Sequence, residues 1–453
     1  MSSDKSLSRR RFLGATALGT SAAVAVASPF VIPRSVLAQP GQVGANDKII
    51  IGFVGARGRA RQLITHIPKE RAKIVAIADF WRQNLEETVN EKRREDFEGG
   101  FPNIDEWNLY DSDLEMYDKE KLDCSFVITS DFNRTLASCN AIAAGLDVFA
   151  EKALTTYIAE GRVLVNFVRK HSRIFQVGSQ QRTMSQNRFG CALVREGKLG
   201  KINLIQARNY YQSRPIPDDL PEEPIPEGFN WNAWQGPTAY RPFNRRLLGW
   251  MQWEEYNGGD MTNWGAHGVD QIQWAMGADD TGPVELYPLM RRRERDGERN
   301  GEYVGRDGAV AAKYANGVEV RFELDPGPAG GAIFRGERGN LEINRNLLRA
   351  NPQELIADAP PLDPLEADDH PGLRWNARPH IHNFFDCMAS RELPVADVEI
   401  GHRTVTFCHL VGICRRLNRR LHWDPVKEQF IGDDQANALV ALPRRAGFEL
   451  PVV

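Results

Sequence analysis

The chain has 453 residues, of which 42% are hydrophobic and 26% are charged, and this length and composition predict a soluble globular protein with more than one domain. Its 57 basic and 60 acidic residues leave a formal net charge of −3, which argues against a nucleic-acid partner because such partners require a basic surface. The six cysteines include no CxxC pair, and no His/Cys cluster has the spacing of metal ligands. We therefore expect no metal site and buried free thiols, with one disulfide as the alternative in an oxidising compartment.

The N-terminal 38 residues have the pattern of an export signal. Arg9-Arg10-Arg11 is followed by Phe12-Leu13, then by a weakly apolar stretch, and a small-residue cleavage pattern ends at Ala38. This resembles a twin-arginine signal, so we expect the twin-arginine export machinery as a partner and a periplasmic or otherwise exported protein without residues 1–38. The alternative is a retained membrane anchor, which Pro29 and Pro33 disfavour.

Strands and helices alternate in the next part of the sequence, residues 46–178. A helical pattern runs from about Arg134 to Ala144. Continuous apolar runs, typical of buried parallel strands, occur at Ile49–Val54, Ile74–Asp79, Cys124–Thr129, Asp147–Ala150 and Ile174–Gly178. The alternation predicts an α/β Rossmann domain with a doubly wound parallel sheet.

The pattern changes after Gly178, so we expect a second domain over residues 179–453. Its predicted elements are a strand at Ile202–Ala207, a Pro/Trp-rich irregular stretch over 215–252, a hairpin of Val310–Tyr314 and Val318–Phe322 around Asn316-Gly317, and helices near His382–Ser390 and Arg403–Asn418. The mixed-charge run 291–296 and the acidic, Pro-rich segment 360–370 are interpreted as solvated loops.

A dinucleotide-binding pattern follows the first strand. The loop Gly55-Ala56-Arg57-Gly58-Arg59-Ala60 opens a helix, where glycines allow a pyrophosphate to approach the helix N-terminus. Asp79 ends the second strand, where an acidic side chain accepts from the ribose hydroxyls and repels a 2′-phosphate, so NAD is favoured over NADP. The alternative is that Gly55 only turns the chain and Asp79 only caps a helix.

Five motifs, in chain order, resemble those of the Gfo/Idh/MocA oxidoreductases, in particular an exported branch of that family. They are Thr129-Ser130-Asp131, Glu151-Lys152-Ala153, residues 176–182 (QVGSQQR), residues 258–270 (GGDMTNWGAHGVD) and residues 397–403 (DVEIGHR). The resemblance implies a Rossmann domain, a second α/β domain with an open, mostly antiparallel sheet, and a homo-oligomer. It implies cofactor binding by Gly55, Ala56, Arg57, Gly58, Asp79, Thr129, Asp131, Glu151 and Lys152, and catalysis by Lys152, His267 and Asn263.

The sequence departs from the family pattern at four positions. Asn263 stands where the family has an Asp partner of the histidine, Ala153 replaces a proline, Arg134 replaces a histidine, and Arg57 replaces a glycine. Asparagine can orient a substrate but cannot carry a proton, so a relay from lysine through this residue to histidine is in question.

Oxidising a sugar hydroxyl requires a base for its proton. Our hypothesis is that Lys152 polarises the substrate oxygen and that His267 acts as base or acid; the alternatives are a surface lysine and a structural histidine bonded to Asp270. We expect substrate contacts from Gln180, Arg182, Trp253, Tyr256 and Asp270, with Asp270 orienting His267.

The main functional prediction is an NAD(P)-dependent oxidoreductase acting on a sugar, sugar acid or polyol. One alternative is a redox-neutral glycoside hydrolase or lyase that uses NAD as a catalyst, and another is a non-catalytic sugar-binding protein. Because free NAD is scarce outside the cytosol, an exported protein would need to carry its NAD tightly bound.

Overall fold

The computed structural model describes residues 48–93, 103–289, 305–345, 347–361 and 377–453. All of these residues belong to a single contact unit, Lys48–Val453. The predicted export signal, the mixed-charge run at 291–296 and most of the acidic segment at 360–370 lie outside the described residues.

The first half of this unit contains a six-stranded parallel sheet in the order β3-β2-β1-β4-β5-β6. Its strands are β1 (Ile49–Val54), β2 (Ala72–Ala78), β3 (Asn108–Tyr110), β4 (Cys124–Val127), β5 (Asp147–Ala150) and β6 (Phe175–Val177). The connecting helices are α2 (Gly58–His66), α3 (Arg82–Arg93), α4 (Asp113–Lys119), α5 (Asp131–Ala143) and α6 (Ile158–Lys170). The strand order reverses between β1 and β4, and a doubly wound sheet binds its ligand beyond the carboxyl ends of strands at such a point. The predicted Rossmann sheet is therefore confirmed.

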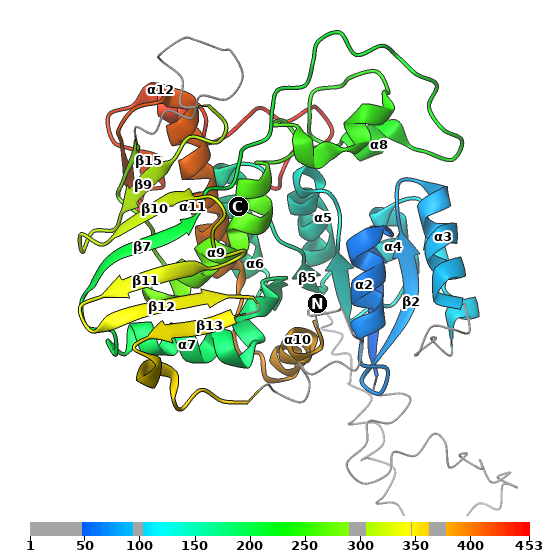
Figure 1. Cartoon of the computed structure of the whole chain (residues 1–453). Coiled ribbons are helices and arrows are strands. Elements are labelled where there is room, and N and C mark those ends of the chain that lie inside the picture. The colour runs from blue at the N-terminus through cyan, green and yellow to red at the C-terminus, as the bar shows by residue number, and fades with distance from the viewer. Residues whose placement is uncertain (1–47, 94–102, 290–304, 346, 362–376) are drawn as a thin grey trace, which may run out of the picture. The chain divides into compact units, whose positions relative to one another are not determined.

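Aromatic rings form the centre of the first core. Phe126 on β4 stacks between Phe53 and Phe149, with ring centroids 4.9 Å and 4.8 Å apart. Phe384 and Phe385, from helix α10 (Arg378–Ser390), meet Phe126 edge-on and are fully buried. A helix from late in the chain therefore completes the core of the N-terminal sheet (Figure 1).

The second half contains a nine-stranded sheet in the order β13-β12-β11-β7-β10-β9-β8-β14-β15. Its strands are β7 (Ile202–Arg208), β8 (Glu285–Pro288), β9 (Val310–Lys313), β10 (Glu319–Leu324), β11 (Ala332–Gly336), β12 (Gly339–Asn344), β13 (Leu347–Asn351), β14 (Leu421–Asp424) and β15 (Gln429–Phe430). The β7–β10 pair is parallel and the other described pairs are antiparallel, which confirms the predicted open, mostly antiparallel sheet.

Helices α9 (Asp260–Ala275) and α11 (Val398–Leu417) pack on this sheet through one apolar core, as Figure 1 shows. The remaining helices of this half are α7 (Ser185–Arg195), α8 (Trp231–Gln235) and α12 (Asp434–Asn437). No helix among the described residues is both long and apolar enough to cross a membrane.

Most predicted elements are present, with shifted ends. The hairpin around Asn316-Gly317 is confirmed as β9 and β10. Helix α11 begins five residues before the predicted Arg403, because the side chain of Asp397 caps it by accepting from the backbone N–H of Glu399. All six cysteines are buried and free, as expected.

Candidate active site

A cavity of about 540 Å³ lies at the carboxyl ends of β1, β2, β4 and β5, beside the point where the strand order reverses. Its walls include every residue predicted to bind the cofactor: Gly55, Ala56, Arg57, Gly58, Asp79, Thr129, Asp131, Glu151 and Lys152. Asn263 and His267 from α9 and Gln180 from the loop after β6 also line it. The glycine loop and four of the five motifs therefore contribute residues to one cavity, whereas residues 397–403 are not among its described lining.

The loop from β1 to α2 explains why Gly55 is required. Gly55 has φ +95°, and a Cβ placed there would lie 2.5 Å from the carbonyl oxygen of Ile128 after β4. Arg57 is the N-cap residue of α2, and the first turn of that helix contains no acidic side chain. The loop therefore has the close approach and the free helix N-terminus that a pyrophosphate requires.

Asp79 lines the cavity beside the end of β2, and three donors hold its carboxylate in place. One oxygen accepts from the backbone N–H of Ala56 at 2.8 Å, and the other accepts from Trp81 N–H and Asn84 Nδ2, both at 2.9 Å. Burial raises the pKa of Asp79, although these hydrogen bonds and Arg57 oppose the shift. A carboxylate offers about four acceptor positions, so one remains for a ribose hydroxyl.

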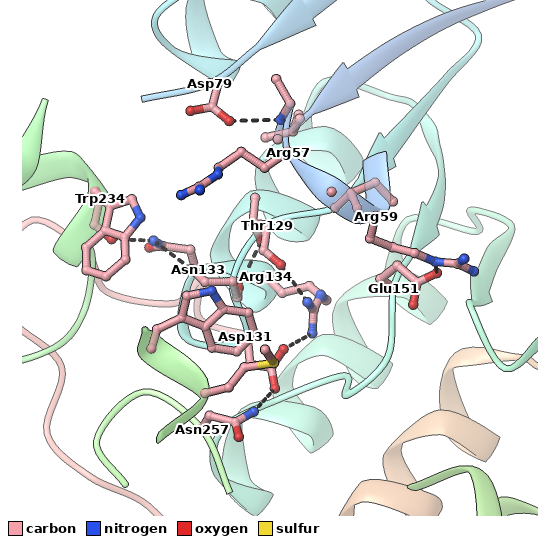
Figure 2. A pocket seen from close by; sticks show the side chains of 18 of the residues that line it. Arg57, Arg59, Asp79, Thr129, Asp131, Asn133, Arg134, Glu151, Trp234 and Asn257 are labelled. Atoms are coloured by element: carbon pink, nitrogen blue, oxygen red, sulfur yellow. Dashed lines mark hydrogen bonds and ion pairs between the residues drawn. The ribbon is translucent and has the colours of Figure 1, made fainter. Parts of the chain in front are cut away.

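The two arginines of the loop have different environments (Figure 2). Arg59 turns toward β5, where its Nε donates to Glu151 at 2.7 Å. Burial opposes ionisation of Glu151, but Arg59 and Lys152 hold its pKa below the ordinary value. Arg57 extends between Asp79 and Trp234 and has no hydrogen-bond or ion-pair partner in the described part of the chain, so it is available to a phosphate.

Asp131 and Arg134 form a buried network at the floor of the cavity. Arg134 donates to Asp131 at 2.7 Å, to the carbonyl of Thr129 at 2.6 Å, and to the carbonyl of Ala153. Asn257 donates to the second oxygen of Asp131 at 2.5 Å (Figure 2). The arginine that replaces the family's histidine therefore holds together the loops after β4 and β5.

Lys152 connects the cofactor side of the cavity to the second half of the chain through Asn263. Its Nζ donates to Oδ1 of Asn263 at 2.6 Å and to the carbonyl of the same residue at 3.3 Å. Burial lowers the pKa of Lys152 to about 8, against the opposing effect of Glu151 and Asp131. The peptide bond between Lys152 and Ala153 is cis. An amine of this pKa can exchange a proton near neutral pH.

His267 is bonded to an arginine that the sequence did not indicate. Nη2 of Arg345 lies 2.8 Å from Nε2 of His267, and both side chains are buried. Burial and this guanidinium, with Lys152 nearby, lower the pKa of His267 well below its ordinary value. Because arginine only donates, Nε2 must accept, and the ring proton is placed on Nδ1.

The expected bond between Asp270 and His267 is absent from the structure, and this prediction is wrong. Asp270 instead accepts from Arg182 at 2.8 Å and from Thr404 at 3.1 Å. Arg182 also donates to Asp279 at 2.6 Å, and its guanidinium lies 5.2 Å from the ring of Trp274. Arg182 and Asp270 thus form a buried structural ion pair and do not line the cavity.

Trp253 and Tyr256 were also expected at the site but belong to a separate aromatic core. They are 1% and 0% exposed, and neither is among the described residues that line the cavity. The aromatic lining comes instead from Phe80, Trp81, Trp234, Trp250 and Trp264. An irregular segment has no sequence periodicity that separates rings facing the cavity from rings packed in the aromatic core. The tryptophans that line the cavity could therefore not be chosen from sequence.

Asp260 is a site residue that sequence reasoning missed. It precedes Asn263 by one helical turn, and Nδ2 of Asn263 lies 3.5 Å from its carboxylate. Burial raises the pKa of Asp260. The carboxylate that the family places at position 263 is thus present one turn earlier, with Asn263 between it and Lys152. Among the described residues, no group of three or more His, Cys, Asp or Glu side chains is arranged to hold a metal ion.

Sequence models of one oxidoreductase family match two segments of the chain. The NAD-binding Rossmann fold of this family matches residues 49–179, and its C-terminal α/β domain matches residues 213–450. The chain therefore belongs to the Gfo/Idh/MocA family of NAD-dependent oxidoreductases. A search of curated proteins finds no match.

Solved structures share the fold at low sequence identity. The WlbA dehydrogenase from Bordetella pertussis, in complex with NADH and UDP-GlcNAcA, is 17% identical with a TM-score of 0.55, covering 83% of this chain and 99% of that one. The aldose-aldose oxidoreductase from Caulobacter crescentus, complexed with glycerol, is also 17% identical with a TM-score of 0.55, covering 83% of this chain and 99% of that one. The scyllo-inositol dehydrogenase from Lactobacillus casei, with NAD(H) and scyllo-inositol, is 16% identical with a TM-score of 0.53, covering 83% of this chain and 99% of that one.

Proposed function

We propose that this protein oxidises a hydroxyl group of a sugar, sugar acid or polyol with NAD, and that Lys152 accepts the hydroxyl proton. One observation carries the proposal: the buried amine of Lys152 shares a single cavity with the glycine loop at Gly55 and with Asp79. The similar structures solved with NADH and UDP-GlcNAcA, and with NAD(H) and scyllo-inositol, support a carbohydrate-like substrate.

The residues of the cavity fit a dinucleotide. The N-terminus of α2 and the unpartnered Arg57 would hold the pyrophosphate, and Asp79 would accept from the ribose hydroxyls. A carboxylate at that position disfavours the 2′-phosphate of NADP. When bound, NAD supplies the acceptor for the hydride that leaves the substrate carbon.

Lys152 and His267 have different proposed roles at the substrate oxygen. Oxidation removes a hydride from carbon and a proton from the hydroxyl group, and neutral Lys152 takes that proton at Nζ. His267 keeps its own proton on Nδ1 and donates a hydrogen bond to the substrate oxygen. Protonating its Nε2 would place two cations face to face, because Arg345 already lies 2.8 Å away. These roles reverse those suggested by the sequence, where His267 was the base or acid.

A second candidate is the redox-neutral hydrolase or lyase, in which the hydride is returned to the same substrate. The observation that favours it is a covered cofactor cavity. The segment after β7 bonds to the end of the first sheet, from Asn230 N–H to the Phe80 carbonyl at 2.8 Å and from Arg82 N–H to the Gly228 carbonyl at 3.0 Å. Asn133 donates to the carbonyl of Trp234 at 2.6 Å. Such a cover would keep NAD bound in an exported protein. A redox-neutral cycle suits a bound NAD, because it returns the hydride to the same substrate.

Two measurements on the full-length protein test the proposal. Mass spectrometry of small molecules released from the pure protein is expected to detect NAD; protein that holds none and takes none up would support the non-catalytic alternative. Incubation with sugars, sugar acids and polyols is expected to produce NADH, whereas cleavage of aryl glycosides without net NADH would support the redox-neutral candidate.

The variant Lys152→Met separates catalysis from folding. It is expected to lower turnover by a factor of about 100 to 10,000, the contribution of a general base. Lys198→Met, at an exposed lysine, is the matched control and should retain full turnover. Unchanged turnover in the Lys152 variant would overturn the role of this residue.

A further inference from the structure

A second cavity of about 470 Å³ adjoins the first, because Met251 and Asn263 line both. Its walls come from the turn after β7, the segment at 251–252, the start of α9 and Arg306. The described lining residues are Tyr211, Ser213, Arg214, Met251, Gln252, Gly259, Asp260, Asn263 and Arg306. Since Asn263 accepts directly from Lys152, this cavity begins one side chain away from the proposed base.

Two arginines in the second cavity are held in place through only part of their donors. Nε of Arg306 donates to the carbonyl of Gln212 at 2.8 Å, and the backbone N–H of Gln212 donates back to the carbonyl of Arg306 at 2.8 Å. The guanidinium of Arg214 lies 4.8 Å from the ring centroid of Trp253, and its Nη2 donates to Gln252 at 3.1 Å. Both Nη groups of Arg306 and two donor nitrogens of Arg214 remain available to a ligand.

Neither arginine has a carboxylate partner in the described part of the chain. Arginines elsewhere around the site do, such as Arg134 with Asp131 and Arg182 with Asp270. Asp260 is the one acidic side chain among the described residues that line the second cavity, and its hydrogen bond is to Asn263, not to either arginine. With two arginines against one acidic side chain, the described lining of the second cavity has an excess of positive charge.

We propose that this second cavity binds a carboxylate of the substrate through Arg306 and Arg214, so that the substrate is a sugar acid and not a neutral sugar or polyol. A guanidinium offers parallel N–H donors that match the two oxygens of a carboxylate, and it remains charged at all physiological pH values. The carboxylate would be held at Arg306 and Arg214, while the hydroxyl to be oxidised reaches Lys152 past Asn263. This assignment rests on the proposed function, which it narrows to one substrate class.

Matched ligand pairs test the assignment with the NAD-loaded full-length protein. D-glucuronate with D-glucose, D-galacturonate with D-galactose, and D-gluconate with D-glucitol differ in a carboxylate against a hydroxymethyl group. Calorimetry measures binding of each compound, and NADH absorbance measures turnover. The acidic member of at least one pair is expected to bind about 10 to 100 times more tightly than its neutral partner, the range expected for charge-assisted hydrogen bonds.

Arg306→Gln and Arg214→Gln identify the groups responsible. Each is expected to weaken binding of the acid about tenfold and to leave the neutral partner unchanged, while Arg349→Gln, at an exposed arginine on β13, changes neither. Thermal unfolding verifies that each variant is folded. Any of three results would overturn the anion site: equal binding of acid and neutral partners, no binding of any acid, or full acid binding in the variant that combines Arg306→Gln with Arg214→Gln. If the anion site fails but neutral sugars are turned over, the proposed oxidoreductase function still stands. If acids bind in a way that depends on Arg306 but nothing is turned over, the anion site stands and the proposed oxidoreductase function fails.

Discussion

The guanidinium of Arg345 donates to Nε2 of His267 at 2.8 Å, and the two side chains are only 4% and 5% exposed. Arg345 follows β12, lies 5.0 Å from the ring centroid of Trp264, and donates through Nε to Gln181 at 3.3 Å. It is therefore held in place from three sides. This contact disfavours protonation of His267, in agreement with our proposal that Lys152 accepts the substrate proton.

Arg345→Met is expected to raise the pKa of His267 toward its ordinary value of about 6.5, since a neighbouring cation is removed while burial remains. The measurement is a pH titration of the imidazole nitrogens by NMR, with Arg349→Gln as the control. In the wild type, the His267 signals should stay those of a neutral ring with its proton on Nδ1 well below that pH. A wild-type His267 that titrates at its ordinary pKa would contradict the tautomer argument.

The pH dependence of oxidation should follow Lys152. Below its pKa of about 8 the amine is protonated and cannot accept the substrate proton, so kcat/KM is expected to rise as the pH increases through about 8 and then level off. Steady-state kinetics across this range, with the substrate established by the tests above, provide the measurement. A profile that instead rises through the pKa of an ordinary histidine would point to His267 as the base.

Asn263→Asp should move that profile to higher pH. A carboxylate in place of the amide oxygen, 2.6 Å from Nζ, would stabilise the ammonium form and raise the pKa of Lys152. We expect a shift of about one pH unit or more and lower activity at neutral pH. Asp260→Asn removes the more distant carboxylate and should shift the profile in the opposite direction by less. An unchanged profile in both variants would show that Lys152 does not set the pH dependence.

Lys152→Met should make the protein more stable as well as inactive. The folded-state pKa of Lys152 is lowered, so the ammonium form is less favourable in the folded than in the unfolded chain, and this cost persists at neutral pH, below both pKa values. Replacing the side chain by methionine removes the cost, and we expect a gain of about 1–2 kcal/mol in the free energy of unfolding. Chemical denaturation at neutral pH measures it. A clear loss of stability would mean that the bond to Asn263 outweighs the burial of charge.

Asp270→Asn should destabilise the fold by about 3–5 kcal/mol, because it leaves Arg182 with one fewer counter-charge in a buried site. Asp386→Asn breaks an exposed pair with Arg71, in which the carboxylate side chain is 66% exposed, and should cost about 1 kcal/mol or less. Denaturant unfolding of the two variants compares them directly. If both variants lost only a similar small amount of unfolding free energy, Asp270 would again be a candidate substrate contact.

The cofactor half of the site could be predicted from sequence because each signal is local. Gly55 directly follows β1, Asp79 directly follows β2, and Lys152 comes two residues after β5. Strand order alone therefore brings these three residues to one edge of the sheet. His267 and Asn263 share one helix face by their spacing of four residues.

The substrate half depends on contacts between distant segments. Arg345 is 78 residues from His267 and carries no motif, so only the folded chain shows the pair. Asp270 was expected to orient His267, but its carboxylate is paired with the buried Arg182. The aromatic lining was misassigned to Trp253 because the irregular segment lacks a period, and its inward rings are those of Trp234 and Trp250.

The place of α10 in the first core has a consequence for biosynthesis. Phe384 and Phe385 pack against Phe126 of β4, so a ribosome must make most of the chain before this core of the dinucleotide domain is complete. Synthesis of most of the second half therefore precedes completion of the first core, and a truncated N-terminal fragment would expose an apolar face to aggregation or proteolysis. Cofactor loading is thereby tied to a nearly complete polypeptide.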